Sequence, residues 1–125
     1  MILLLDAHAL LWALADDPTL RHEARESIVS PENDVLVSAA TVWEIGIKRR
    51  LGKLDAPADL LGAIAASRFV GLPVTLADAD AAARLPPHHR DPFDRMLVAQ
   101  TRRLGAVVVT RDSAFGLYGV EALAC

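Results

Sequence analysis

Four acidic residues stand at places in the chain from which their carboxylates could act on one substrate: Asp6, Glu44, Asp94 and Asp112. Asp6 and Asp112 follow short apolar runs that are typical of buried strands. Glu44 lies one to two turns into the helix that follows another strand, and Asp94 lies in the first turn of a helix. Ligands of an open parallel sheet bind at the carboxyl ends of its strands. We therefore expect the four carboxylates to share one cleft.

A cleft lined by four carboxylates is suited to binding a hard metal ion. Four carboxylates in a partly desolvated space repel one another, and without a cation some of them would take up protons. Oxygen ligands without His or Cys suit Mg²⁺ or Mn²⁺. Such ions, held near a scissile phosphate, activate water and stabilise the developing charge. The pattern favours a nuclease that needs no covalent nucleophile.

Each acid also has a purely structural interpretation. Asp6 could cap the helix that follows it, and Asp112 could be an ordinary turn aspartate. Thr41 and Glu44 match the capping-box pattern, in which the glutamate reaches back to the threonine N–H. These interpretations lose weight when the acids are considered together, because all of them fall near strand ends or helix starts.

The segment 89–101 organises the chain. Asp91 is a good N-cap, and Pro92 suits the first helical turn, where its missing N–H would have had no partner. Asp94 lies in that turn, where the helix dipole favours negative charge, and it could also be a capping partner of Asp91. We predict that Asp91 caps the helix and supports the site; direct contact with a metal is the alternative.

The expected elements alternate along the chain. The strands are expected at 2–5, 35–37, 71–74 (an edge strand, given Pro73) and 106–109, with 118–122 as a short final strand. The helices are expected at 7–15, 19–30, from Ser38 or Thr41 to about 51, 58–69, 75–85 and 91–105. This order predicts one domain over residues 1–125, a three-layer α/β/α sandwich with a mostly parallel sheet.

The composition is that of a globular protein. Hydrophobic residues make up 53% of the 125 residues and charged residues 23%. The single cysteine, Cys125, allows no internal disulfide, and the net charge of −3 does not indicate nucleic-acid binding. The apolar runs are too short to span a bilayer, and Asp6 closes the first of them where a signal peptide would continue. These features predict a cytoplasmic protein without a membrane segment.

Four stretches carry a family resemblance: 4–12 (LLDAHALLW), 38–45 (SAATVWEI), 90–95 (RDPFDR) and 109–112 (VTRD). In this order they closely resemble the PIN domain, and more narrowly the VapC-type toxins of bacterial toxin–antitoxin pairs. The resemblance implies a PIN fold, a Mg²⁺- or Mn²⁺-dependent endoribonuclease, a homodimer, and inhibition by a cognate antitoxin. It places the family's catalytic and metal-binding quartet on Asp6, Glu44, Asp94 and Asp112.

The resemblance also assigns supporting positions. Asp6 and Asp94 match the positions tied most directly to the metal. Thr110 and Ser113 match places where a hydroxyl often supports the last acid. Ala7 departs from the pattern, since relatives often carry Thr or Ser there. We expect this departure to affect the rate of catalysis rather than the kind of enzyme.

The remaining polar and aromatic residues have simpler interpretations. His88 and His89 follow two prolines and are predicted to lie at the surface, since a metal mechanism does not need them. The residues 48–50 are interpreted as a solvated basic helix face.

Two aromatic and two basic side chains are also assigned. Trp12 and Trp43 are predicted to be core or dimer residues rather than platforms for base stacking. Arg95 and Arg111, each next to an acid, are expected to neutralise carboxylates or to contact phosphate.

Other functions need residues that the chain lacks. A receiver domain requires a second acid beside Asp6 and a lysine after a late strand, but the only lysines are Lys48 and Lys53. An Asp-x-Asp phosphatase would place an acid where His8 stands. The alternative that remains is a PIN domain that binds RNA or a partner without cutting.

Overall fold

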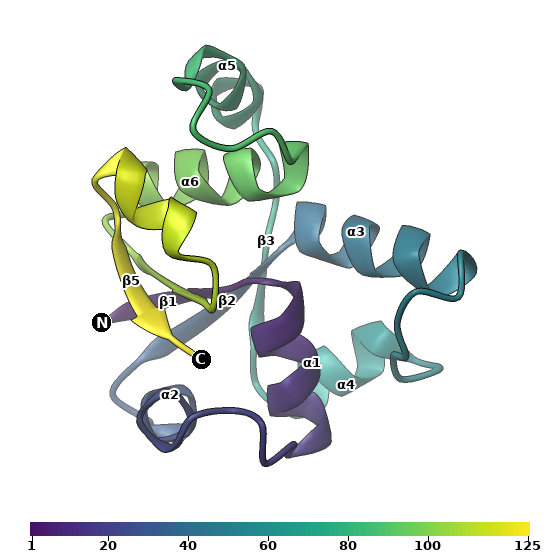
Figure 1. The fold of residues 1–125 in the computed structure, drawn as a ribbon. Coiled ribbons are helices and arrows are strands. Elements are labelled where there is room, and N and C mark those ends of the chain that lie inside the picture. The colour runs from purple at the N-terminus through teal and green to yellow at the C-terminus, as the bar shows by residue number, and fades with distance from the viewer.

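The computed structural model describes residues 1–125 and has five parallel strands in the order β3-β2-β1-β4-β5. The strands are β1 (Ile2–Leu5), β2 (Asp34–Ser38), β3 (Val70–Leu72), β4 (Val107–Thr110) and β5 (Glu121–Ala124). The helices are α1 (Ala7–Ala15), α2 (His22–Val29), α3 (Ala39–Arg50), α4 (Leu60–Ala66), α5 (Leu76–Arg84), α6 (Pro92–Leu104) and the short 3₁₀ helix η1 (Ser113–Tyr118). Helices lie on both faces of the sheet (Figure 1). The predicted α/β/α sandwich is confirmed, and its sheet is entirely parallel.

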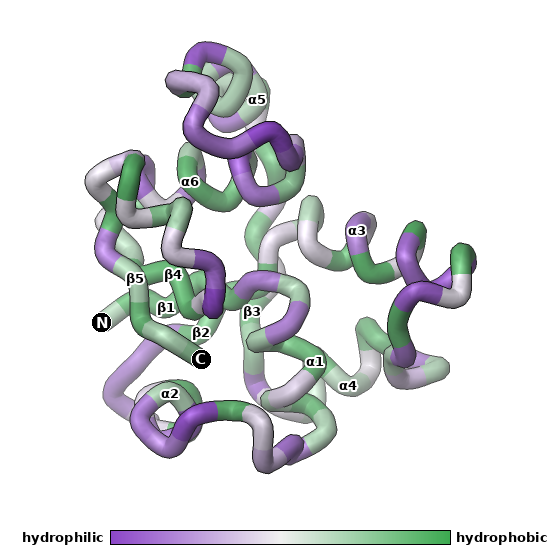
Figure 2. The backbone as a smooth tube through the Cα atoms, viewed as in Figure 1, coloured by the Kyte–Doolittle hydropathy of each residue, from purple (hydrophilic) through white to green (hydrophobic).

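The two faces of the sheet are buried in separate cores, because successive side chains of a strand point to opposite faces. Leu3 and Leu5 of β1 belong to a core that includes residues of α1, α2, α3 and α4. Leu4, between them, packs with residues of α6 and η1. Figure 2 shows hydrophobic residues along the central strands and a hydrophilic loop between α5 and α6. The carboxyl ends of β1 and β4 lie outside these two cores, next to the positions where helices begin.

Side-chain caps fix where every helix except α2 begins, and they decide one open alternative. The Ser38 hydroxyl accepts the N–H of Ala40, so Ser38 is the N-cap of α3. Thr41 is buried inside the helix with its hydroxyl unpaired. The capping-box interpretation of Glu44 was therefore wrong, and its carboxylate is free for another role.

Several element bounds differ from those predicted. Asp59 caps α4 and Arg68 adopts a left-handed φ of 62°, so this helix is shorter at both ends than 58–69. The α2 helix begins later than expected, since the Thr19 N–H bonds to Asp17 in a turn. Gly119 ends η1 with a φ of 72°, which delays the last strand to Glu121.

The edge position of β3 is as predicted, although this strand ends before Pro73. None of the helices has both the length and the apolar character needed to cross a membrane.

Candidate active site

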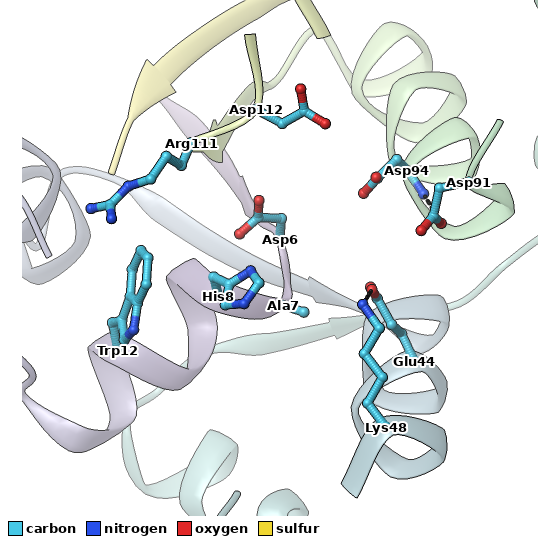
Figure 3. A pocket seen from close by; sticks show the side chains of 10 residues that line it. All are labelled: Asp6, Ala7, His8, Trp12, Glu44, Lys48, Asp91, Asp94, Arg111 and Asp112. Carbon is cyan, nitrogen blue, oxygen red and sulfur yellow. Dashed lines mark hydrogen bonds and ion pairs between the residues drawn. The ribbon is translucent and has the colours of Figure 1, made fainter. Parts of the chain in front are cut away.

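A cavity of about 470 Å³ opens at the carboxyl ends of β1 and β4. Ten residues line it: Asp6, Ala7, His8, Trp12, Glu44, Lys48, Asp91, Asp94, Arg111 and Asp112. All four acids predicted from the sequence are among them, with Asp91 as a fifth. Figure 3 shows that the four acids come from separate elements and that the Asp94 carboxylate is turned toward Asp6 across the pocket. The predicted convergence is therefore present in the fold.

Asp6 lies at the junction of β1 and α1. Its carboxylate accepts the N–H of Ala9 at 2.9 Å, so it caps α1 while lining the cavity. Burial raises the pKa of Asp6, and hydrogen bonds from Thr110 and Ala9 oppose that rise. The structural role and the pocket role proposed for Asp6 thus coexist, because each uses only part of the carboxylate.

Asp91 and Asp94 share the first turn of α6. Asp91 Oδ1 accepts the N–H groups of Phe93 and Asp94 at 2.8 and 3.3 Å, which confirms it as the N-cap. Burial raises the pKa of Asp94 to about 7, and the charges of Asp91, Glu44 and Asp6 add to the rise while His89 opposes it. The pocket therefore concentrates more negative charge than its own residues can neutralise.

Glu44 lies on the face of α3 that is turned toward the pocket. It is buried, and its Oε2 accepts a hydrogen bond from the Lys48 ammonium at 2.7 Å. This bond is the main cause of a raised pKa for Lys48. The sequence predicts a solvated basic helix face at residues 48–50, but Lys48 lines the cavity. The four-residue spacing from Glu44 to Lys48 is the signal that could have identified it.

Asp112 follows β4 and caps η1. Its Oδ1 accepts the N–H of Ala114 at 2.9 Å, which is the main cause of a lowered pKa for Asp112. The Asp112 N–H in turn donates to the Thr110 hydroxyl at 3.1 Å. Thr110 is thus a support of the last acid, as expected, whereas the exposed side chain of Ser113 makes no hydrogen bond in the structure.

His89 is the pocket neighbour that the sequence reasoning placed wrongly. Its side chain is only 15% exposed, and its Nε2 lies 2.9 Å from Asp94 Oδ2 and 2.7 Å from Asp112 Oδ2. The preceding prolines suggested a surface loop, which is correct for His88. The sequence signal that could have identified His89 is its position two residues before the capping residue Asp91. A loop that leads into a helix must pass close to the N-terminus of that helix.

Residues 3–120 match the family model of the PIN domain. The chain belongs to the PIN domain family. No curated protein matches it in sequence.

The fold is similar to that of several solved structures. VapBC2 from Rickettsia felis, bound to a DNA fragment from their promoter, has a TM-score of 0.72 at 14% identity, covering 99% of this chain and 98% of that one. DNA-bound VapBC from Salmonella typhimurium has a TM-score of 0.71 at 18% identity, covering 99% and 98%. VapC20 from Mycobacterium tuberculosis, described as a sarcin-ricin loop cleaving toxin, has a TM-score of 0.64 at 20% identity, covering 94% and 95%.

The two arginines next to acids have other partners in this PIN domain. Arg111 donates to the carbonyls of Thr19 and Cys125, and its guanidinium lies 4.4 Å from the centre of the Trp12 ring. The guanidinium of Arg95 donates to backbone carbonyls only: those of Ala82, Ala83, Leu85, Pro86 and His89, at 2.8 to 3.4 Å. The expectation that these residues neutralise the neighbouring acids was wrong, since neither forms an ion pair with an acidic side chain; contact with phosphate, the other expectation, stays a prediction.

The two tryptophans also differ from each other. Trp12 is half-buried and packs against the core beneath α1, as predicted. Trp43 is 67% exposed and meets the Phe93 ring edge-on, with the ring centres 5.3 Å apart. Trp43 is therefore not a core residue, and its role at a dimer interface stays a prediction.

Replacing Arg95 by Ala should destabilise the protein by about 2–3 kcal/mol, because five carbonyl groups at the end of α5 and in the following loop lose one charged donor. Arg95→Lys should recover only part of this loss, since an ammonium lacks the planar fork. Urea unfolding measures the effect. Arg84→Ala, which removes an exposed ion pair with Asp80, is the control and should leave the stability almost unchanged. Equal effects of Arg95→Ala and Arg84→Ala would contradict this role.

The metal-free protein should lose stability as the pH rises from about 4 to about 7. The pKa of Asp94 is about 7 in the fold and near 3.8 in an unfolded chain, so the folded state binds the proton more tightly over this range. The melting temperature measured in EDTA should fall by a few degrees between pH 5 and pH 8. Asp94→Asn should flatten this dependence. A wild-type melting temperature that rises over the same range would contradict the assignment.

Proposed function

We propose that this single PIN domain is a metal-dependent endoribonuclease of the VapC type, the toxin of a bacterial toxin–antitoxin pair. The observation that carries the proposal is the convergence of Asp6, Glu44, Asp94 and Asp112 on one cavity. These residues are far apart in the sequence, and the helix starts and strand ends of the fold bring them together. The described toxins and toxin–antitoxin complexes of similar fold support the narrower assignment.

The same four carboxylates are proposed to hold Mg²⁺ or Mn²⁺. Their donor atoms are hard oxygens, and the raised pKa values of Asp6 and Asp94 indicate a site that is short of positive charge. Lys48 is the one ammonium that lines the cavity, and it is already paired with Glu44. A bound divalent ion would lower the pKa of water near a scissile phosphate and stabilise the charge that develops on its oxygens.

The chain's own residues would prepare the site for that reaction. Asp91 orients the first turn of α6 and thereby the Asp94 carboxylate. Thr110 fixes the backbone of Asp112 by accepting its N–H, and the Asp6 N–H donates to the Val109 carbonyl at 3.1 Å, which ties the ends of β1 and β4 together. Lys48 is partly exposed at the cavity and can bind a phosphate oxygen while it remains near Glu44.

The proposed partners are an RNA substrate, a cognate antitoxin and a second copy of the chain. Exposed apolar side chains follow one another at four-residue spacing along α3 and its C-cap: Trp43, Ile47 and Leu51. This pattern supports contact with another protein. An enzyme that acts on cellular RNA would work in the cytoplasm.

Expression in growing bacteria tests the toxin function. Induction of the wild-type gene should stop growth and produce discrete fragments of cellular RNA, and Asp6→Asn should do neither at equal protein level. Asp34→Asn, at the exposed start of β2, is a matched control that should remain toxic. Wild-type protein that accumulates and binds RNA without cutting it would instead favour the alternative function, a PIN domain that binds RNA or a partner without cutting.

A further inference from the structure

His89 is fixed in place by its backbone before its side chain is considered. Its N–H donates to the Tyr118 hydroxyl at 2.8 Å, and that hydroxyl donates to the carbonyl of Pro86 at 2.7 Å. Its carbonyl accepts from Arg95 at 3.2 Å. The loop between α5 and α6 is thus tied to η1 and to α6, the two elements that present Asp112 and Asp94.

The hydrogen bonds of the imidazole assign its tautomer. Nδ1 accepts the N–H of Asp91 at 3.2 Å, so in the neutral ring the hydrogen is carried by Nε2. That Nε2–H lies between two carboxylates, 2.7 Å from Asp112 Oδ2 and 2.9 Å from Asp94 Oδ2. The imidazole also makes a T-shaped contact with the Phe115 ring, with the ring centres 6.1 Å apart.

We propose that His89 is a positioning residue, which holds the Asp94 and Asp112 carboxylates close enough to share a divalent cation, with one oxygen of each within 4.8 Å of the other. This inference rests on the proposed function of the pocket. Asp112 needs such an anchor, since its side chain is 44% exposed and its Oδ1 is occupied by the Ala114 N–H. Without His89, its Oδ2 would have no partner and the carboxylate would be free to turn away from Asp94.

The same geometry argues against His89 as a metal ligand. A ligand nitrogen must offer a lone pair, and at Nε2 this would require the ring hydrogen to move to Nδ1. The Nδ1–H would then point at the N–H of Asp91, which now donates to that atom. Neighbours that orient metal-binding side chains typically contribute 10- to 100-fold to metal affinity.

Binding of Mn²⁺ to the purified protein tests this role. Calorimetry should give a dissociation constant about 10- to 100-fold weaker for His89→Ala than for wild type. His89→Gln, which can place an amide N–H near the former Nε2 position, should recover most of the loss. His88→Ala removes the exposed neighbouring histidine, which contacts Tyr118 and no acid, and should bind like wild type. Circular dichroism checks that every variant is folded.

Pulsed electron paramagnetic resonance of the wild-type Mn²⁺ complex adds an independent readout, and it should show no directly bound nitrogen. A directly bound nitrogen would overturn the proposal by making His89 a ligand. Unchanged affinity in folded His89→Ala, or equal losses in His89→Ala and His89→Gln, would also overturn it while leaving the metal site intact. Wild-type protein that binds no Mn²⁺ would contradict the proposed function itself, a different result from any of these.

Discussion

Asp94→Asn should reduce RNA cleavage by about 10²-fold or more, because it removes a charge from the centre of the proposed metal site. The substitution keeps the size of the side chain, and Asp91 still caps the helix. It should also abolish the rise in melting temperature that Mn²⁺ gives by binding only the folded state. In EDTA at pH 8 the variant should be at least as stable as wild type, since it relieves the repulsion that raises the pKa of Asp94 to about 7.

Three measurements on the same preparations separate these effects: cleavage, the melting temperature with and without Mn²⁺, and the melting temperature in EDTA. Asp80→Asn, on the exposed side of α5, is the matched control and should cut RNA and respond to Mn²⁺ as wild type does. An Asp94→Asn protein that cuts at the wild-type rate would refute the assignment of the site.

Asp78 should give the largest loss of stability among the acidic residues. It is 1% exposed and receives bonds from three residues: the Arg103 guanidinium at 2.6 and 3.0 Å, Gln100 Nε2 at 3.2 Å and the Thr75 N–H at 3.1 Å. The Thr75 hydroxyl accepts the Asp78 N–H in return, which completes a capping box. Asp78 thereby fastens α5 to α6, the helix that carries Asp94.

Asp78→Ala should lower the free energy of unfolding by about 3 kcal/mol and Asp78→Asn by about 2 kcal/mol. Breaking a buried ion pair leaves the partner charge without compensation, although Arg103 is 39% exposed and can be rehydrated in part. Denaturant unfolding at pH 7 measures both values. Asp80→Ala on the same helix should have little effect. A loss below about 1 kcal/mol for Asp78→Ala would show that this network does not hold the two helices together.

The same residue should make the protein sensitive to acid. The Arg103 guanidinium is the main cause that lowers the pKa of Asp78 to about 2 from 3.8. The resulting stabilisation is complete above about pH 4 and is lost as the pH falls toward 2. Asp78→Asn should therefore be less acid-sensitive than wild type between these values, as measured by unfolding at a series of pH values.

The fold and the acidic quartet could be predicted because both depend on local signals. Runs such as 2–5 and 106–109 are apolar and β-branched enough to predict buried strands, and Asp91-Pro92 marks a helix start without ambiguity. Strand ends and helix starts then meet at one edge of a parallel sheet. Asp6 and Asp94 follow from that geometry with no knowledge of tertiary contacts.

Two of the residues that the sequence analysis misplaced, His89 and Arg95, have partners that lie far away along the chain. His89 reaches Asp112 across 23 positions, and Arg95 reaches back to carbonyls of α5. The adjacent acids suggested ion pairs for Arg95 and Arg111, but both guanidinium groups donate to main-chain oxygens instead. The hydrophobic periodicity of the sequence does not predict the contacts of His89 and Arg95, because they depend on how the loop between α5 and α6 folds over the start of α6.

The central claim is that the carboxylates of this pocket cut RNA with the help of a divalent ion. Incubation of total cellular RNA with the purified protein in Mg²⁺, Mn²⁺ or EDTA, with wild type beside Asp6→Ala, tests it most directly. We expect discrete fragments with Mg²⁺ or Mn²⁺, none in EDTA and none with Asp6→Ala. Cleavage that persists in EDTA, or that Asp6→Ala retains, would contradict the claim.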